Sequence, residues 1–354
     1  MKKVAVIILN WNGAALLRRY LPGVLENTDD TLADVIVADN GSDDESRDVL
    51  DREFPQVKTL CFESNLGFAG GYNRAIKETG YELTILLNSD VRTPAGWLAP
   101  LIEALDDEAV GAVQPKLLKD RDDDRRVFEY AGAMGGFLDK HGYPYCRGRV
   151  FASVEDDRGQ FDADGVTPVF WASGACLAVR TAAFTAVGGL DASFFAHMEE
   201  IDLCWRLQLA GYRVVVTPRS EVFHLGGGSL PQGNARKTYL NFRNNLLMLR
   251  KNLPAREGRR LLVVRRLLDT LALVQTLLKG HWGDVKAIVK AHRDYRKMSR
   301  QYTTFPTRNL LHDTPQGRCD IVWNYYGRRR TTYHRIFPPT STTTHGTQTA
   351  QENQ

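Results

Sequence analysis

Short apolar runs alternate with amphipathic segments along the first third of the chain. Four runs rich in β-branched residues predict strands over residues 4–9, 35–38, 57–62 and 83–87. Between them, apolar positions recur with helical spacing over residues 14–25 and 46–53. This alternation predicts an α/β fold, with a Rossmann-like, mostly parallel sheet and helices on both faces. Ligands of such sheets bind at the carboxyl ends of the strands.

Polar turns follow the four predicted strands. They read NWNG (10–13), DNGSDD (39–44), SNLGFAGGYN (64–73) and NSDVRTP (88–94). The third turn precedes a predicted helix at residues 74–78, which would let its backbone N–H groups face a phosphate. Its spacing matches neither the P-loop nor the GxGxxG pattern, which argues against a kinase and a dehydrogenase.

The rest of the chain changes character twice. Residues 120–168 are charged and glycine-rich, and they predict a hairpin or loop elaboration. A regular pattern then returns, with a strand at 171–180, a helix at 181–187, a helix at 199–210 and a strand at 212–216. Helices are expected over residues 239–300, with breaks at Pro254 to Gly258 and at Gly280 to Gly283.

Three carboxylates crowd the start of the predicted helix 199–210. At about 100° per residue, Glu199, Asp202 and Arg206 share one polar sector. An ion pair between Asp202 and Arg206 and the helix dipole at Glu199 explain two of the acids structurally. Glu200 instead lies on the side of Leu203, without a basic residue three or four positions later. Such a carboxylate is a candidate for a raised pKa and general-base catalysis; the alternative is an ordinary first-turn acid.

Asp90 and His224 form a second candidate set. Asp90 ends the NSD turn after the fourth strand, and His224 lies in VFHLGGGS after another strand. Together with water and phosphate oxygens they would suit Mg²⁺ or Mn²⁺. The alternatives are a turn cap for Asp90 and a purely structural histidine. Asp39 in the DNGS turn is likewise explained by turn chemistry alone.

These pieces, taken in order, resemble the inverting family 2 glycosyltransferases, which have the GT-A fold. The resemblance spans roughly residues 3–250 and looks closest to the rhamnosyltransferase-like members. It rests on the following ordered motifs: VIILNWNG, VADNGSDD, SNLGFAGGYNRA, LLNSDV, SGAC, VGGLD, MEEIDLCWR and FHLGGGS.

The resemblance implies roles for individual residues. Asp39 and the turn at Leu9 would contact the nucleobase of a nucleotide-sugar donor. The family's Asp-x-Asp motif appears with Asn in its first position, which leaves Asp90 as the carboxylate ligand of Mg²⁺ or Mn²⁺, with His224 assisting. The family's Glu-Asp pair appears as Glu199-Glu200, so Glu200 would be the general base. The donor-binding set is Leu9, Asn10, Trp11, Asp39, Asn65, Gly67, Asn73, Asn88 and Ser89, and the acceptor-side set is Trp171, Ser173, Gly174 and Glu199.

The activity that the resemblance implies is transfer of a sugar from a nucleoside-diphosphate sugar to a glycan hydroxyl. The acceptor would be lipid-linked, or an oligosaccharide, in cell-surface polysaccharide synthesis. A non-catalytic carbohydrate-binding or scaffold relative is an alternative, but it should lack Asp90, Glu200 or His224. A sugar nucleotidyltransferase is another, but the first turn has no glycine-rich, basic segment for a triphosphate.

Charge separates the chain into an acidic body and a basic helical region. Residues 1–249 hold 26 Lys and Arg against 35 Asp and Glu, whereas residues 250–300 hold 14 against 4. A basic region implies an anionic partner, and its bulky aliphatics favour a membrane surface over nucleic acid. The proposed lipid-facing stripe contains Leu261, Val264, Leu268, Leu271 and Leu278, flanked by Arg259, Arg260, Arg265, Arg266 and Lys279. The alternative is that both helices of this region pack on the body.

Location and domain organisation follow from the same survey. No apolar run reaches about 18 residues, and the N-terminus lacks a signal-peptide pattern. We therefore expect a cytoplasmic protein, peripheral on the inner face of the plasma membrane. Five scattered cysteines indicate reduced, mostly buried thiols rather than disulfides or a zinc site. The predicted divisions are a catalytic domain (1–238), a basic helical region (239–300), an extension (301–337) and a disordered tail (338–354).

Overall fold

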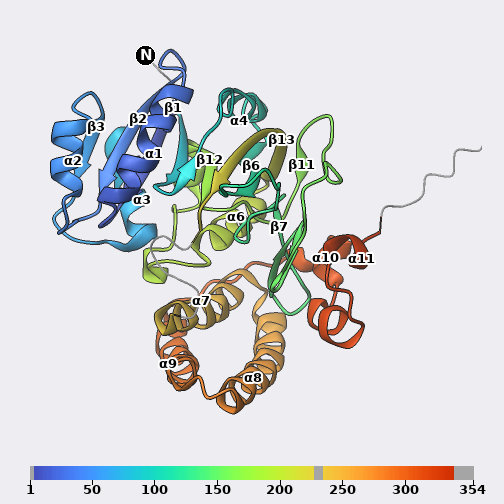
Figure 1. Cartoon of the computed structure of the whole chain (residues 1–354). Coiled ribbons are helices and arrows are strands. Elements are labelled where there is room, and N and C mark those ends of the chain that lie inside the picture. The colour runs from blue at the N-terminus through green and yellow to red at the C-terminus, as the bar shows by residue number, and fades with distance from the viewer. Residues whose placement is uncertain (1–3, 227–233, 339–354) are drawn as a thin grey trace, which may run out of the picture.

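A nine-stranded sheet lies at the centre of the molecule (Figure 1). We describe a computed structural model of the chain, over residues 4–226 and 234–338. The strand order is β11-β13-β6-β12-β4-β1-β2-β3, and β5 pairs with β13. The strands are β1 (Val4–Asn10), β2 (Ala33–Asp39), β3 (Lys58–Cys61), β4 (Leu83–Asn88), β5 (Val91–Arg92), β6 (Val110–Lys119), β11 (Thr167–Pro168), β12 (Cys176–Arg180) and β13 (Arg213–His224).

The sheet is mostly parallel, as predicted. β1 pairs in parallel with both β2 and β4, and β2 pairs in parallel with β3. β12 lies antiparallel between β4 and β6, and β13 is again parallel to β6. The carboxyl ends of β1, β2 and β4 therefore meet at one edge, where the polar turns lie.

Helices cover both faces of the sheet. Val4, Val6 and Ile8 of β1 point into one core, whereas Ala5 and Ile7 point into the other, as strand geometry requires. The first core is covered by α1 (Ala14–Asn27), α2 (Ser46–Glu53) and α4 (Ala99–Ala104). The second is covered by α3 (Gly67–Thr79), α5 (Thr181–Ala186) and α6 (Glu199–Leu209).

The elaboration predicted within residues 120–168 contains a small antiparallel sheet. Its strands are β7 (Gly136–Leu138), β8 (Pro144–Cys146), β9 (Arg149–Val150) and β10 (Ser153–Val154). The C-terminal helices are α7 (Ala235–Asn252), α8 (Ala255–Leu278), α9 (Trp282–Met298), α10 (Pro315–Arg318) and α11 (Tyr333–Ile336). Short helical turns are η1 (Ala192–Phe194), η2 (Ser299–Gln301), η3 (Leu310–His312) and η4 (Trp323–Gly327). In Figure 1, α7, α8 and α9 form a helical group beside the sheet.

Three local predictions are wrong. The glycine-rich turn is not a loop before a helix at residue 74, because α3 already begins at Gly67, whose N–H donates to Asn65 Oδ1 at 2.7 Å. The strand predicted at 171–180 begins only at Cys176. Gly258 does not break a helix, since it lies inside α8. In addition, neither β6 nor α4 was predicted from the sequence.

The predicted domain boundary at residue 238 falls inside α7. Leu246 to Leu249 of this helix share the core that α6 covers, so α7 is packed against the body. The division into domains stays a prediction. The end of the FHLGGGS motif and the expected disordered tail, apart from its first residue, lie in residues 227–233 and 339–354, outside the described ranges.

The inner face of α8 buries a narrow row of residues, both polar and apolar: Gly258, Leu262, Arg265 and Asp269. Arg265, only 3% exposed, lies 3.9 Å above the Tyr143 ring and pairs with Asp269 at 3.3 Å. The prediction that Arg265 flanks an exposed stripe is therefore wrong. Leu261 and Leu268 of the predicted stripe are half-buried, so the stripe itself is rotated from its predicted position.

The outer face of α8 is apolar. Seven large side chains are exposed along it, up to 83% for Leu278: Val263, Val264, Leu267, Leu271, Val274, Leu277 and Leu278. Most of them recur every three or four residues, which places the set on one broad helical surface. Arg259, Arg260 and Arg266 are exposed beside them. Within the two described ranges, no helix is both long enough and apolar enough to span a membrane. All five cysteines are free thiols, and three of them are buried.

Candidate active site

The turns after β1 and β2 are hydrogen-bonded to each other. Asn10 Nδ2 donates to Asp39 Oδ2 at 3.2 Å and to Ser42 Oγ at 3.3 Å. Asp39 and Asn10 are fully buried, whereas Trp11 in the first turn is 44% exposed. An exposed indole beside a buried carboxylate suits a planar, hydrogen-bonding group such as a nucleobase.

Arg47 is a partner of Asp39 that the sequence did not reveal. Its Nε donates to Asp39 Oδ1 at 2.9 Å, and its Nη2 donates to the carbonyl oxygen of Phe62 at 2.8 Å. Arg47 is the second residue of α2, where its position resembles that of a surface residue of an amphipathic helix. Only the approach of α2 to the end of β3 brings it to the carboxylate.

Two asparagines secure the start of α3. Asn40 Nδ2 donates to Asn65 Oδ1 at 3.1 Å, and Asn40 Oδ1 accepts from the N–H of Leu66 at 3.0 Å. Gly67 has φ of +73°, and a Cβ there would lie 2.6 Å from the carbonyl oxygen of Phe195. Glycine is required here for both reasons.

Asn73 serves the backbone of a neighbouring loop. Its Nδ2 donates to the carbonyl oxygen of Leu190 at 2.7 Å, and its Oδ1 accepts from the Leu190 N–H at 2.9 Å. This two-way bond positions the loop that leads into α6. Its predicted place at the border of the donor stays a prediction.

Asp90 and His224 meet at the ends of β4 and β13. Antiparallel pairing of β5 with β13 sets His224 opposite Val91, and His224 Nε2 lies 3.0 Å from Asp90 Oδ1. On the other side of the ring, Nδ1 lies 3.4 Å from Glu129 Oε1. Burial alone would lower the pKa of His224, but the Asp90 and Glu129 carboxylates outweigh it and raise the pKa to about 10.

The residues at this position fit a divalent cation. A metal-binding histidine usually presents its second ring nitrogen to a carboxylate, which fixes the ring. Glu129 stands at Nδ1 in that way, so Nε2 faces Asp90. One carboxylate oxygen and one imidazole nitrogen suit Mn²⁺ or Mg²⁺ completed by water and phosphate oxygens. Asn88 Nδ2 lies 3.4 Å from the same nitrogen. Glu129 was not predicted, because it follows an isolated bridge in the irregular region.

The Glu199–Glu200 pair opens α6. Burial raises the pKa of Glu200 to about 7, although backbone N–H groups of Glu200, Ile201 and Met198 oppose the rise. Burial and the charge of Glu200 raise the pKa of Glu199 well above its usual range. One oxygen of each carboxylate, Oε2, is buried without a hydrogen-bond partner among the described residues. The pair is thus poised to exchange a proton near neutral pH.

Of the predicted acceptor-side residues, Gly174 lies close to the Glu200 side chain. A Cβ on Gly174 would lie 3.0 Å from Phe68 Cζ and 3.7 Å from Glu200 Cβ. Trp171 and Ser173 are buried and already bonded, the indole N–H to the Phe137 carbonyl oxygen and the Ser173 N–H to the Gln114 side chain. Their acceptor role stays a prediction.

Cys146 links the two carboxylate groups in space. Burial raises the pKa of this thiol to about 11, and the charges of Glu129 and Glu200 both contribute to the rise. Both carboxylates therefore act on one buried thiol, although 71 positions separate them in the sequence.

Asp202 has the structural role that was predicted. It is fully buried and pairs with Arg206 at 2.7 Å and with Lys251 at 2.9 Å. Asn252 Nδ2 also donates to it at 2.7 Å. It therefore ties α6 to α7.

We expect Asp202→Asn to reduce the free energy of unfolding by on the order of 3 kcal/mol, because two partly buried cations lose their counter-charge. Urea denaturation would measure this loss, and turnover per folded molecule should stay near that of the wild type. Unchanged stability, or a turnover loss as large as that of Glu200→Gln, would contradict the structural role.

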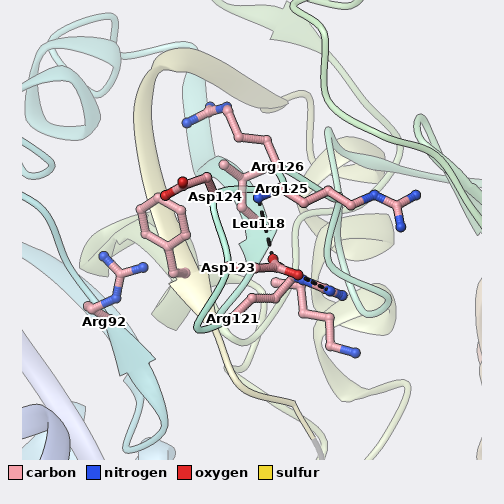
Figure 2. A pocket seen from close by; sticks show the side chains of 9 residues that line it. Arg92, Leu118, Arg121, Asp123, Asp124, Arg125 and Arg126 are labelled. Carbon is pink, nitrogen blue, oxygen red and sulfur yellow. Dashed lines mark hydrogen bonds and ion pairs between the residues drawn. The ribbon is translucent and has the colours of Figure 1, made fainter.

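A separate hollow of about 250 Å³ lies beside β5 and β13 (Figure 2). None of the predicted site residues lines it. Its arginines are engaged with acids, for example Arg121 with Asp123 and Arg125 with Asp156. Figure 2 shows the first of these pairs within the hollow. We interpret it as a surface ion-pair network rather than as the donor site.

Comparison with known proteins identifies the family and the fold. The sequence profile described as glycosyl transferase family 2 matches residues 5–157. The N-acetylglucosaminyl-diphospho-decaprenol L-rhamnosyltransferase of Mycobacterium tuberculosis is 30% identical over 236 residues, which cover 62% of this chain and 75% of that protein. The pre-mycofactocin glycosyltransferase of the same species is 26% identical over 242 residues, covering 67% of this chain and 46% of that protein.

The fold also matches a solved structure. GalNAc-T7 with UDP, GalNAc and Mn²⁺ superposes with a TM-score of 0.55 at 16% identity, over 71% of this chain. This chain covers 48% of the GalNAc-T7 chain. At this identity the likeness concerns the fold, and it agrees with the predicted GT-A architecture.

Proposed function

Since this chain belongs to glycosyl transferase family 2 and is a glycosyltransferase, we propose that it transfers a sugar from a nucleoside-diphosphate sugar to a hydroxyl of a lipid-linked glycan. The observation that carries this proposal is the Glu199–Glu200 pair at the start of α6, in which Glu199 is buried, Glu200 is half-buried and the pKa of Glu200 is about 7. The name of the mycobacterial relative describes rhamnosyl transfer to a diphospho-decaprenol-linked N-acetylglucosamine. We therefore propose a rhamnose donor and an acceptor of that class.

The reaction needs a base because a sugar hydroxyl is a poor nucleophile near neutral pH. Glu200 removes the hydroxyl proton as the oxygen attacks the anomeric carbon. The attack is in line with the departing nucleoside diphosphate, so the configuration inverts and the protein forms no covalent intermediate. Asp90 and His224 would hold a divalent cation, which supplies charge to offset that of the leaving diphosphate.

An assay of donor cleavage tests the proposal. UDP-, dTDP- and GDP-sugars would be incubated with the protein, Mg²⁺ or Mn²⁺, and a diphospho-lipid-linked N-acetylglucosamine. We expect release of one nucleoside diphosphate that depends on the acceptor, and an added sugar by mass spectrometry. The absence of acceptor-dependent release with every donor would overturn the proposal.

We further propose that the outer face of α8 binds the anionic membrane that carries the acceptor. The exposed stripe from Val263 to Leu278 lies beside Arg259, Arg260 and Arg266, a combination of apolar area and positive charge suited to an anionic bilayer. Each basic residue contributes about 1 kcal/mol near such a surface. Residues 250–300 contain 14 Lys and Arg but only 4 Asp and Glu, an excess of ten basic residues.

We expect a triple change of Arg259, Arg260 and Arg266 to Gln to weaken binding to phosphatidylserine vesicles by roughly 10²-fold, since three such contributions are lost. Co-sedimentation at several salt concentrations would measure it. A matched control removes three exposed charges elsewhere, at Arg18, Arg52 and Lys77. Equal loss in the control, or equal recovery with neutral vesicles, would show that α8 does not recognise an anionic surface.

A further inference from the structure

The five residues before the Glu199–Glu200 pair adopt an unusual backbone. Phe195, His197 and Met198 have φ of 68°, 69° and 72°, a backbone region that residues other than glycine rarely adopt. The Ala196 N–H donates to the carbonyl oxygen of Phe194 at 2.8 Å, which closes a γ-turn of the rare positive-φ kind. Such a backbone persists only where its surroundings impose it.

Asn244 of α7 imposes much of this conformation. Its side chain is fully buried, and Nδ2 donates to three carbonyl oxygens of the segment: Phe194 at 3.0 Å, Ala196 at 2.9 Å and His197 at 2.8 Å. An amide offers only two N–H groups, so they are shared among the three oxygens. One side chain thus binds three carbonyl oxygens within four consecutive residues.

Arg243 supports the same contact. Its Nε donates to Asn244 Oδ1 at 2.8 Å, which orients the amide so that the NH₂ group faces the segment. Its Nη2 donates to the carbonyl oxygens of Ser193 at 3.1 Å and Phe194 at 2.9 Å. The two neighbours in the sequence therefore form one clamp on residues 193–197.

The opposite side of the segment lies against α3. The Ala69 N–H donates to the carbonyl oxygen of Phe195 at 3.2 Å, close to Gly67. Met198 immediately precedes α6 and has a left-handed backbone conformation. Its N–H is among the backbone groups that lower the pKa of Glu200. The segment therefore connects the predicted donor side, the clamp and the proposed base.

We infer that Asn244, oriented by Arg243, is a positioning residue that holds residues 194–198 in the conformation that aims Glu200 at the acceptor hydroxyl. The inference rests on the proposed role of Glu200 as the base. Neither residue touches the reacting atoms. The contribution of Asn244 is the fixed direction from which α6 starts.

Kinetics of Asn244→Ala test the inference. With the segment released, kcat should fall by roughly 10²-fold, the effect of about 1 Å of misplacement, while the KM for the donor stays within about twofold. The acid limb of the pH–rate profile should move to higher pH, because backbone N–H groups that lower the pKa of Glu200 are lost. A loss of packing alone would not move that limb.

Asn252→Ala is the matched control. Asn252 is also a buried asparagine of α7 that bonds to α6, but its partner is Asp202 rather than residues 194–198. We expect it to lower the melting temperature without moving kcat or the acid limb. If Asn244→Ala does not fold, Arg243→Lys is measured by the same criteria.

The outcomes separate the inference from the proposed function. If the wild type transfers no sugar, the proposed function fails. If the wild type is active but a folded Asn244→Ala variant keeps kcat, or loses it to the same degree as Asn252→Ala with an unmoved acid limb, the positioning role is overturned.

Discussion

Glu200→Gln is expected to lower kcat by roughly 10²–10⁴-fold, the usual contribution of a general base. The amide keeps the size of the side chain but cannot accept the proton of the acceptor hydroxyl. Donor binding, measured by calorimetry with the nucleoside diphosphate, should survive. Asp202→Asn is the matched control, since it removes a carboxylate two residues away in the same helix. Near-normal turnover in Glu200→Gln would remove Glu200 from the mechanism.

The pH dependence of the wild type follows from the same group. A base acts when ionised, so kcat/KM should fall as the pH drops below about 7, the pKa of Glu200. Stability should change in the opposite direction. The folded carboxyl binds its proton more tightly than the unfolded one, so stability decreases as pH rises from the ordinary glutamate value through about 7. Glu200→Gln should therefore be more stable than the wild type at pH 8 while being nearly inactive.

Asp90→Ala is expected to produce the second large effect, on metal-dependent binding of the nucleoside diphosphate. Removing a residue that is only hydrogen-bonded to a metal ligand typically reduces metal affinity by about 10–100-fold. Removing the ligand itself should therefore reduce the affinity by at least the same factor. Calorimetric titrations with and without Mn²⁺ would measure the difference. Without the metal, Asp90→Ala and the wild type should bind the nucleotide alike.

Two controls sharpen this prediction. Glu129→Gln leaves Asp90 and His224 in place but weakens the carboxylate behind the imidazole, so its affinity for Mn²⁺ should lie between those of Asp90→Ala and the wild type. EDTA should abolish turnover, and added Mn²⁺ or Mg²⁺ should restore it. If EDTA leaves turnover untouched, the cation proposal fails.

The amino-acid pattern alone determined the four parallel strands β1 to β4 and the order of the turns that follow them. Runs of β-branched residues that end in polar turns form strands in almost any context, because alternating side chains bury both faces. Local spacing was also enough for the Asp202–Arg206 pair, four residues apart on one helix, and for the separate environment of Glu200. These are interactions within a few residues, which periodicity describes well.

Tertiary structure decided everything that depends on long-range contacts. Arg47 reaches Asp39, Glu129 reaches His224, and Arg265 turns inward only after separate elements have packed together. The left-handed backbone before Glu199 has no signature in FFAHM, since none of its residues is a glycine. Its cause is Asn244, nearly fifty residues later in a helix whose sequence shows only an amphipathic pattern. Local propensity disfavours such a backbone, and only hydrogen bonds supplied by a packed neighbour stabilise it.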